Sequence, residues 1–138
     1  MSATFIVDAS VGFSWVHQGQ ATVETDKLLE AVAAGAQVVV PALWHLEMAN
    51  VLLIAQRRHR MTATQRKAAL EQLTAMQFIV DEEGARQAFG KTSELAEKHG
   101  LTIYDATYLE LAVRRSLPLA TRDESLKRAA KQCGVKAI

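Results

Sequence analysis

The strongest constraint on the fold is a regular alternation of short apolar runs with longer amphipathic segments. The runs are rich in Val, Ile, Leu and Phe. In the segments that follow them, apolar residues recur at the spacing of a helix. Runs that are apolar on both sides suit parallel strands, which helices cover on both faces. The predicted fold class is α/β: an α/β/α sandwich with a short, mostly parallel central sheet of four to five strands. The expected strands are 4–7, 37–40, 77–80 and 117–121, with 135–138 as the candidate fifth.

The expected helices follow from apolar spacing and from residues that begin or end helices. Thr102 is suited to cap a helix that opens at Tyr104 or Asp105, and Ser10 stands at a capping position after the first strand. The segment 83–99 has an inward face that would include Phe89, and Gly100 closes it. The expected helices are 11–17, 22–34, 43–58, 62–76, 83–99, 104–115 and 123–133.

Length and composition fit one small domain over residues 1–138, and 49% of the residues are hydrophobic. The lone cysteine, Cys133, excludes an internal disulfide framework and fits a reducing compartment, so we expect a cytoplasmic protein. The sequence begins without the pattern of a signal peptide, and no apolar run approaches the roughly 20 residues of a membrane span. A net charge of +1 does not decide for or against a nucleic-acid partner.

Four acidic residues occupy positions where an ordinary surface carboxylate would not be expected. Asp8 and Asp123 stand just past the first and fourth strands, at the edge where open α/β sheets bind ligands. Asp105 and Glu47 lie on apolar helix faces, where a lone charge costs several kcal/mol. Each also has a structural explanation: Asp8 as a turn residue, Asp123 as a helix cap, Asp105 as a first-turn acid, and Glu47 as the partner of a buried arginine.

Taken together, the four acids favour a metal site. If they converge at about 5–6 Å, each pair repels by roughly 3 kcal/mol at an effective dielectric of about 20. Such a cluster must take up protons or hold cations, and hard oxygen ligands suit Mg²⁺ or Mn²⁺. A pair of such ions suits phosphodiester hydrolysis, because one activates a water and the other steadies the leaving oxygen. The predicted catalytic and metal-binding residues are Asp8, Glu47, Asp105 and Asp123.

Other polar residues are candidates for supporting roles. Ser10 and Thr121 each lie two residues from one of the acids, and Asn50 lies one helical turn beyond Glu47. The two hydroxyls could hold a water or a phosphate oxygen, or could equally act as local caps. Candidate phosphate-binding cations are Arg122, Arg57 and Arg58, although the last two also close a helix, where cations favour the dipole.

At these residues the sequence resembles PIN-domain ribonucleases of the VapC type, which are toxins of bacterial toxin–antitoxin pairs. The resemblance rests on FIVDAS (5–10), HLEMANVL (45–52), LTIYDATYLELA (101–112) and LATRDESL (119–126). It implies a PIN-like fold and an RNA endonuclease that depends on Mg²⁺ or Mn²⁺ and uses these four acids. It further implies a homodimer that a small antitoxin inhibits. One departure is Glu110, where similar proteins often have a small residue; we expect it to form an exposed ion pair with Arg114.

Two alternatives remain open from the sequence. The chain could transfer phosphoryl groups with Asp8 as the nucleophile, because Asp-x-Ser after a strand resembles an aspartyl-phosphate site. It could instead be a module without catalytic activity that binds RNA or a partner protein. If an antitoxin does bind, we expect the apolar helix pair around 52–73 to receive it, with part of that surface in a dimer contact.

Overall fold

A computed structural model describes residues 3–138, and within this range four strands form one parallel sheet in the order β3-β2-β1-β4. The pairing places Thr4 beside Gln37 and Ile6 beside Leu119. The predicted α/β class with a parallel sheet is therefore confirmed. The strands are β1 (Thr4–Val7), β2 (Gln37–Pro41), β3 (Phe78–Asp81) and β4 (Leu119–Ala120).

The candidate fifth strand is reduced to a single bridge. Ala137 makes an isolated parallel bridge to Leu119, and the Ile138 backbone N–H donates to the Leu119 carbonyl at 3.0 Å. The strand expected over 117–121 is likewise short, because Thr121 leaves the sheet and turns its hydroxyl toward Asp8. The polar residue Thr121 thus follows β4 directly.

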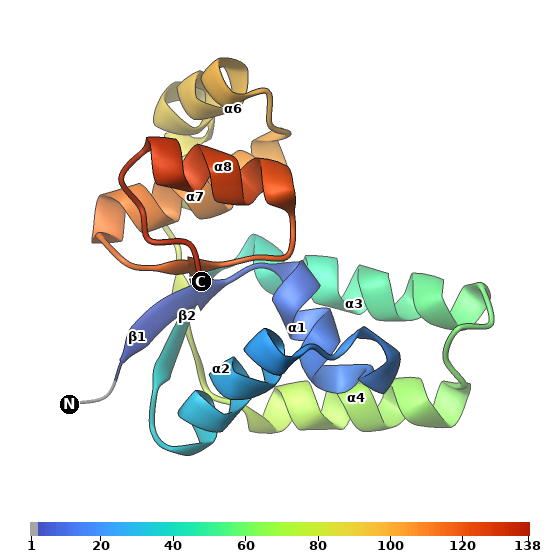
Figure 1. The fold of residues 1–138 in the computed structure, drawn as a ribbon. Coiled ribbons are helices and arrows are strands. Elements are labelled where there is room, and N and C mark those ends of the chain that lie inside the picture. Colours follow the sequence, from blue (N-terminus) through green and yellow to red (C-terminus); the bar gives the residue numbers. More distant parts are fainter. Residues whose placement is uncertain (1–2) are drawn as a thin grey trace.

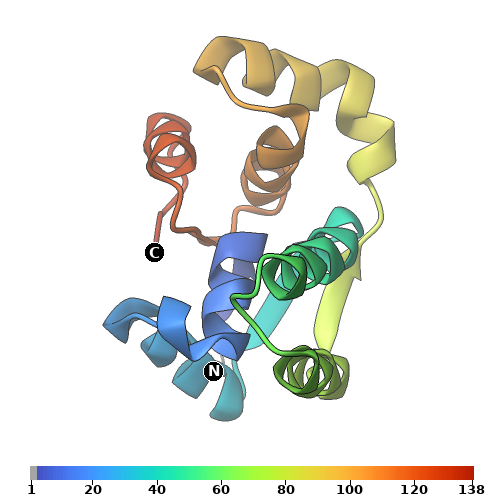
Figure 2. The same cartoon turned by 90° about the vertical axis from the view of Figure 1, so that its right-hand side faces the viewer.

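Helices cover both faces of the sheet (Figures 1 and 2). One layer contains α5 to α8, with α7 packed on the strands, and the other contains α1 to α4. A short 3-10 helix, η1 (Gln18–Gln20), joins α1 to α2. The helices are α1 (Ala9–Val16), α2 (Val23–Ala33), α3 (Leu43–Arg57), α4 (Ala63–Ala75), α5 (Gly84–Gln87), α6 (Ser93–His99), α7 (Ile103–Arg115) and α8 (Glu124–Gln132).

The helix cap predicted at Thr102 is confirmed, and two further threonines act in the same way. Thr22, Thr62 and Thr102 each accept a hydrogen bond from a backbone N–H three residues on, as an N-cap does. None of the helices within residues 3–138 combines the length and the apolar character that crossing a membrane requires.

The segment 83–99 is not the one regular helix that the sequence predicted. A π-helical turn, η2 (Ala88–Thr92), separates α5 from α6. A π-turn carries an extra residue and therefore shifts the helical phase of the segment before it relative to the segment after it. Leu95 remains buried, but Phe89 is fully exposed, so its predicted inward position is wrong.

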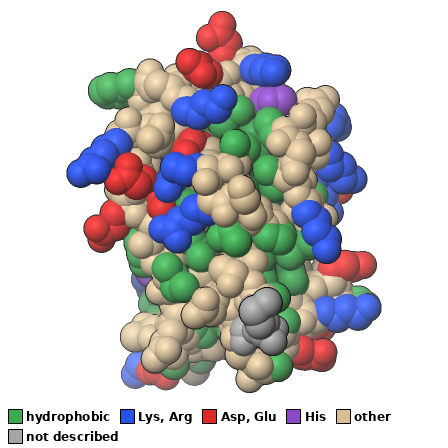
Figure 3. Space-filling model, turned by 90° about the vertical axis from the view of Figure 1, so that its left-hand side faces the viewer, with side chains coloured by type: hydrophobic (Ala, Val, Ile, Leu, Met, Phe, Trp, Pro, Cys, Tyr) green, Lys and Arg blue, Asp and Glu red, His purple; other side chains and the backbone are tan. Residues whose placement is uncertain are grey.

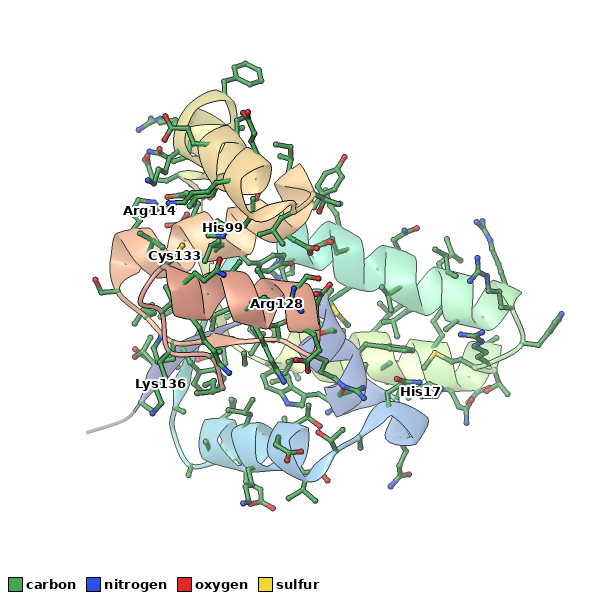
Figure 4. All side chains as sticks on the ribbon, turned by 45° about the horizontal axis from the view of Figure 1, so that its top comes forward. His17, His99, Arg114, Arg128, Cys133 and Lys136 are labelled. Atoms are coloured by element: carbon green, nitrogen blue, oxygen red, sulfur yellow. The ribbon has the colours of Figure 1, made fainter. Side chains whose placement is uncertain are left out.

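The core contains the tryptophans, and a half-buried cysteine packs against it. Trp44 and Trp15 are buried, and their indole N–H groups donate to the Asp8 and Thr25 carbonyls. Cys133 caps the end of α8, where its sulfur lies 3.4 Å from His99 Nε2 (Figure 4).

Gly12 allows α1 and α3 to approach closely. A Cβ there would lie 2.8 Å from both Met48 Sδ and Trp44 Cζ2. We expect Gly12→Ala to lower the free energy of unfolding by about 1–3 kcal/mol, because the buried neighbours must shift. Chemical denaturation monitored by circular dichroism measures this loss. Gly90→Ala is the control, since a Cβ there meets nothing within 4 Å, and it should leave stability nearly unchanged. Equal stabilities for the two variants would contradict this packing argument.

Candidate active site

Asp8 lies where the first strand becomes the first helix. It directly follows β1, and its backbone N–H donates to the Ala120 carbonyl of β4 at 3.1 Å. Its side chain, not that of Ser10, caps α1, because Oδ1 accepts from the Val11 N–H at 3.2 Å. Ser10 Oγ donates to the same oxygen at 2.6 Å, and Thr121 Oγ1 donates to Oδ2. These hydroxyls fix the orientation of a carboxylate that is only 5% exposed.

Glu47 approaches the same region from the half-buried face of α3. Its Oε1 accepts a hydrogen bond from the Tyr108 hydroxyl of α7 at 2.5 Å, so its partner is a phenol and not a buried arginine. Tyr108 is a site residue that was not predicted from the sequence. The available signal was its spacing, since it lies three residues after Asp105 and shares a helix face with it. Asn50, the predicted companion of Glu47, is exposed.

The remaining two acids begin helices. Asp105 lies half-buried in the first turn of α7, where its backbone N–H donates to Thr102 Oγ1 at 3.0 Å. Asp123 caps α8: its Oδ1 accepts from the Ser125 and Leu126 N–H groups at 2.8 and 3.1 Å. The cap explanation for Asp123 is therefore correct, and its charge also acts on Asp105.

The pKa values of three of the acids, Asp8, Glu47 and Asp105, are shifted in the same direction. Burial raises the pKa of Asp8, despite the hydrogen bonds that favour its charged form. Burial also raises the pKa of Glu47, to which the charges of Asp105 and Asp8 add. For Asp105, burial and then the charges of Asp123 and Asp8 raise the pKa. The pKa of Tyr108 is raised as well, chiefly by burial, so this phenol remains a hydrogen-bond donor at neutral pH.

The donor chemistry of these residues suits a hard divalent cation. Carboxylate and hydroxyl oxygens are the ligands that Mg²⁺ and Mn²⁺ prefer, and a cation would relieve the mutual repulsion. Over residues 3–138, no three His, Cys, Asp or Glu side chains gather closely enough to form a ligand set by themselves. Mg²⁺ does not require such a set, because it commonly takes one or two carboxylates and completes its shell with water and substrate phosphates.

The predicted phosphate-binding arginines differ in their positions. Arg122 is exposed, but its Nη1 already donates to Ser14 Oγ at 3.0 Å and to the Gln20 carbonyl at 2.8 Å. Arg57 and Arg58 are exposed at the far end of α3, ten or more residues and therefore roughly 15 Å from Glu47. In Figure 3, which views the side on which the strands begin, Lys and Arg flank a central apolar region. The acids lie beyond the opposite ends of the strands.

The sequence predicted that Glu110 forms an exposed ion pair, but the structure places this ion pair in a buried position. The pairing with Arg114 is correct, with Nε donating to Oε2 at 2.8 Å, but Glu110 is only 2% exposed. The same guanidinium, labelled in Figure 4, also binds both oxygens of Asp81 at the end of β3. Arg115 adds a third arginine–carboxylate contact, to Asp81 Oδ1. This buried group joins β3 to α7, and none of its hydrogen bonds among the described residues involves the four acids.

The raised pKa of Asp105 predicts a pH-dependent change in stability. A carboxylate whose pKa is higher in the folded than in the unfolded state destabilises the fold above that pKa, and acidification removes the penalty. We therefore expect Asp105→Asn to raise the free energy of unfolding at pH 7 by about 0.5–1 kcal/mol, after allowance for solvent screening. The gain should vanish as the pH falls toward about 4.

Thermal unfolding of both proteins between pH 7 and pH 4, in the presence of EDTA, measures this difference. Addition of Mn²⁺ should then stabilise the wild type more than Asp105→Asn. Glu71→Gln, on the exposed side of α4, is the control and should change neither response. A variant that is less stable than the wild type at pH 7 would show that Asp105 is a net stabilising residue.

Comparison with solved structures finds the same fold in other proteins. PAE2754 from Pyrobaculum aerophilum matches with a TM-score of 0.71 and 24% identity, covering 99% of this chain and 92% of that one. VapBC2 from Rickettsia felis, bound to a DNA fragment from the promoter, matches with a TM-score of 0.69 and 13% identity. The match covers 98% of this chain and 97% of that one. A toxin–antitoxin complex from Klebsiella pneumoniae matches with a TM-score of 0.57 and 19% identity, and the match covers 86% of each chain.

Sequence comparison gives the family. None of the curated protein sequences compared with this chain matches it. The family model described as PIN domain, however, matches residues 5–132, which include all four acids and the strands and helices that carry them. The chain belongs to the PIN domain family.

Proposed function

We propose that this chain is a metal-dependent RNA endonuclease and the toxin of a toxin–antitoxin pair. PIN domains are generally nucleases. The single observation that carries the proposal is the gathering of buried and half-buried carboxylates beyond the strand ends: burial raises the pKa values of Asp8, Glu47 and Asp105, and for Glu47 and Asp105 the charges of neighbouring acids add to that effect. Ionisable groups whose pKa values are shifted by burial and by neighbouring charges are typical of functional sites.

In this proposal Asp8, Glu47, Asp105 and Asp123 would hold Mg²⁺ or Mn²⁺. The bound ion would supply the charge that makes water a better nucleophile and neutralises the leaving oxygen. Ser10 and Thr121 keep Asp8 in one orientation, as Tyr108 does for Glu47. The role of Asn50 remains a prediction.

The alternative with Asp8 as a phosphoryl acceptor has less support. A nucleophilic carboxylate needs a free oxygen that can reach the phosphorus atom. In Asp8, one oxygen accepts from Ser10 and from a backbone N–H, the other accepts from Thr121, and the residue is buried. These hydrogen bonds favour a carboxylate that is held in place over one that attacks.

The proposed partners are an RNA substrate, a second copy of the chain and a small antitoxin, all in the cytoplasm. Two of the structural neighbours are named for toxin–antitoxin assemblies, which supports the antitoxin. The surface we propose for it is an apolar groove of about 490 Å³ between α3, α4 and β3. Leu52, the first residue of the range 52–73 expected from the sequence to receive the antitoxin, is fully buried and cannot contact a partner. The partly exposed residues that line the groove and could contact a partner include Leu70, Leu73, Met76 and Phe78, whereas Trp44 and Met48, which also line it, are buried.

The test is a cleavage assay on purified protein with end-labelled structured RNA, in Mg²⁺ or Mn²⁺ and in EDTA. We expect internal cleavage with either ion and none with EDTA. Isothermal titration with Mn²⁺ separates the nuclease from a module without catalytic activity. An absence of both cleavage and Mn²⁺ binding at millimolar ion would favour the module and overturn the proposal.

A further inference from the structure

The turn between α3 and α4 carries a concentration of positive charge that neither the fold nor the four acids explain. Residues 48–70 contain five Lys or Arg and no Asp or Glu, although the net charge of the whole chain is only +1. Three of these cations, together with His59, occupy four consecutive exposed positions, 57–60, which we call the basic turn. Figure 1 shows it at the end of the α3–α4 pair that points away from the sheet.

Hydrogen bonds hold the backbone of the basic turn, so its side chains are presented from a defined support. His59 has a left-handed conformation with a φ of 58°, and its N–H donates to the Gln56 carbonyl at 3.0 Å. The Arg60 N–H donates to the Ala55 carbonyl at 2.9 Å, so α3 ends in a Schellman motif. His17, labelled in Figure 4, joins the turn to the end of α1, because its Nε2 lies 3.0 Å from the Arg60 carbonyl.

The cationic side chains have no acidic partner in the fold. Among residues 3–138, none of the ion pairs involves a Lys or Arg of residues 48–70. The dipole of α3 favours a cation in its last turn, but this effect falls off within that turn and does not require three arginines. Neighbouring arginines also repel one another, and a bound polyanion would remove that repulsion.

The basic turn lies in line with the candidate active site. Arg58, the C-cap residue of α3, comes eleven residues after Glu47. This spacing is about three helical turns, so the two residues share a face of α3 and are separated by roughly 16 Å along its axis. Between them that face contains Val51 and Ile54 and no carboxylate. The four acids repel a phosphate chain, so affinity for RNA has to come from cations outside them.

We propose that the basic turn is a second RNA-binding site, which holds the phosphate backbone at about five nucleotides from the scissile bond, since phosphates of a stacked strand follow one another by roughly 3.4 Å. Arginine suits this role because its planar guanidinium can donate two parallel hydrogen bonds to one phosphate. Such contacts position a nucleic acid without reading its sequence. The inference rests on the proposed nuclease function and adds a length requirement: RNA too short to reach the basic turn gains nothing from it.

The test measures binding of a fluorescein-labelled 20-nucleotide single-stranded RNA by fluorescence anisotropy, in EDTA and at several KCl concentrations. The variant replaces three arginines by glutamine: Arg57→Gln, Arg58→Gln and Arg60→Gln. Near about 0.1 M salt we expect it to bind about 10- to 100-fold more weakly than the wild type, because three phosphate contacts release fewer counterions when they are lost. For the same reason, the slope of log Kd against log salt should fall by about 2.

The control removes the same amount of charge from elsewhere on the surface. It combines Lys91→Gln, Lys98→Gln and Lys131→Gln, three exposed cations on η2, α6 and α8, and should bind like the wild type. Circular dichroism checks that both triple variants fold. An equal loss of affinity in the two variants would show that only the net charge matters and would overturn the inference.

Three further results would overturn it. They are the absence of RNA binding by the wild type, equal affinities and slopes for the wild type and the arginine variant, and a loss confined to another ligand. A 20-base-pair DNA duplex and a co-expressed antitoxin test the last of these. If the arginine variant loses the binding of either one but keeps that of RNA, the basic turn serves DNA or a protein.

Cleavage in Mn²⁺ separates this inference from the proposed function. With the 20-nucleotide RNA, the arginine variant should have a raised KM and a kcat within about twofold of the wild type, as expected for lost binding. With a fragment trimmed to three nucleotides on each side of the cleaved bond, the two proteins should have equal KM. If the wild type cleaves and the variant cleaves the long RNA with unchanged KM, the nuclease proposal stands and this inference falls. If the basic turn binds RNA but the wild type cleaves none, the binding site stands and the nuclease proposal falls.

Discussion

Replacement of Asp8 by Asn should reduce RNA cleavage by at least about 10³-fold, while the protein still folds. A loss of this size corresponds to about 4 kcal/mol of transition-state stabilisation. Asp8 is the most buried of the four acids and accepts hydrogen bonds on both oxygens. Asparagine has the same shape and is an equally good N-cap, so α1 should form, but the negative charge that would attract a cation is lost.

Single-turnover cleavage of end-labelled RNA in Mn²⁺ measures this effect, and circular dichroism checks the fold. Glu30→Gln removes an exposed carboxylate on α2 and is the control, with cleavage expected to equal that of the wild type. Cleavage by Asp8→Asn within about threefold of the wild type would contradict any mechanism that depends on this carboxylate.

The positions of these acids could be predicted because they depend on local sequence and on one topological rule. Asp8 comes directly after a short apolar run, and the carboxyl ends of adjacent parallel strands meet at the same edge. Thr102 and Thr62 cap helices because their side chains bond to N–H groups three residues away, within one turn. Short-range geometry of this kind is visible in the sequence.

The features that could not be predicted depend on contacts between distant segments. Tyr108 meets Glu47 across 61 residues, and the sequence does not indicate that α3 and α7 cross at that point. The π-turn that exposes Phe89 leaves no mark in the apolar spacing of 83–99. Glu110 illustrates the limit most clearly: the spacing of four residues correctly indicates Arg114, but not the burial of a group that includes Asp81, 33 residues from that arginine.

Arg114→Ala should destabilise the fold by about 3–5 kcal/mol, because removal of one partner from a buried ion pair leaves uncompensated charge. The guanidinium donates to both oxygens of Asp81 at 2.7–2.9 Å and to both oxygens of Glu110 at 2.8–3.0 Å. The side chains of Asp81 and Glu110 are 1% and 3% exposed, so both carboxylates depend on this guanidinium to compensate their charge inside the fold. Without Arg114, Asp81 keeps Arg115 as its one cationic partner among the described residues, together with the Glu83 backbone N–H, which donates to Oδ2 at 3.2 Å.

Urea unfolding at pH 7 and pH 5 measures this loss, with Arg115→Ala as the control. Arg115 is more exposed, and within residues 3–138 its guanidinium bonds to Asp81 alone, so its removal should cost about 1 kcal/mol. Arg114 lowers the pKa of Asp81, chiefly through its hydrogen bonds, so in the wild type this contribution is present at neutral pH and is lost as the pH falls below the ordinary aspartate range. In Arg114→Ala the two carboxylates face each other with less compensation, and protonation relieves the repulsion. The variant should therefore recover part of its lost stability at pH 5. A loss of stability that is equal at pH 7 and pH 5, or no larger than that of Arg115→Ala, would show that packing and not charge holds β3 to α7.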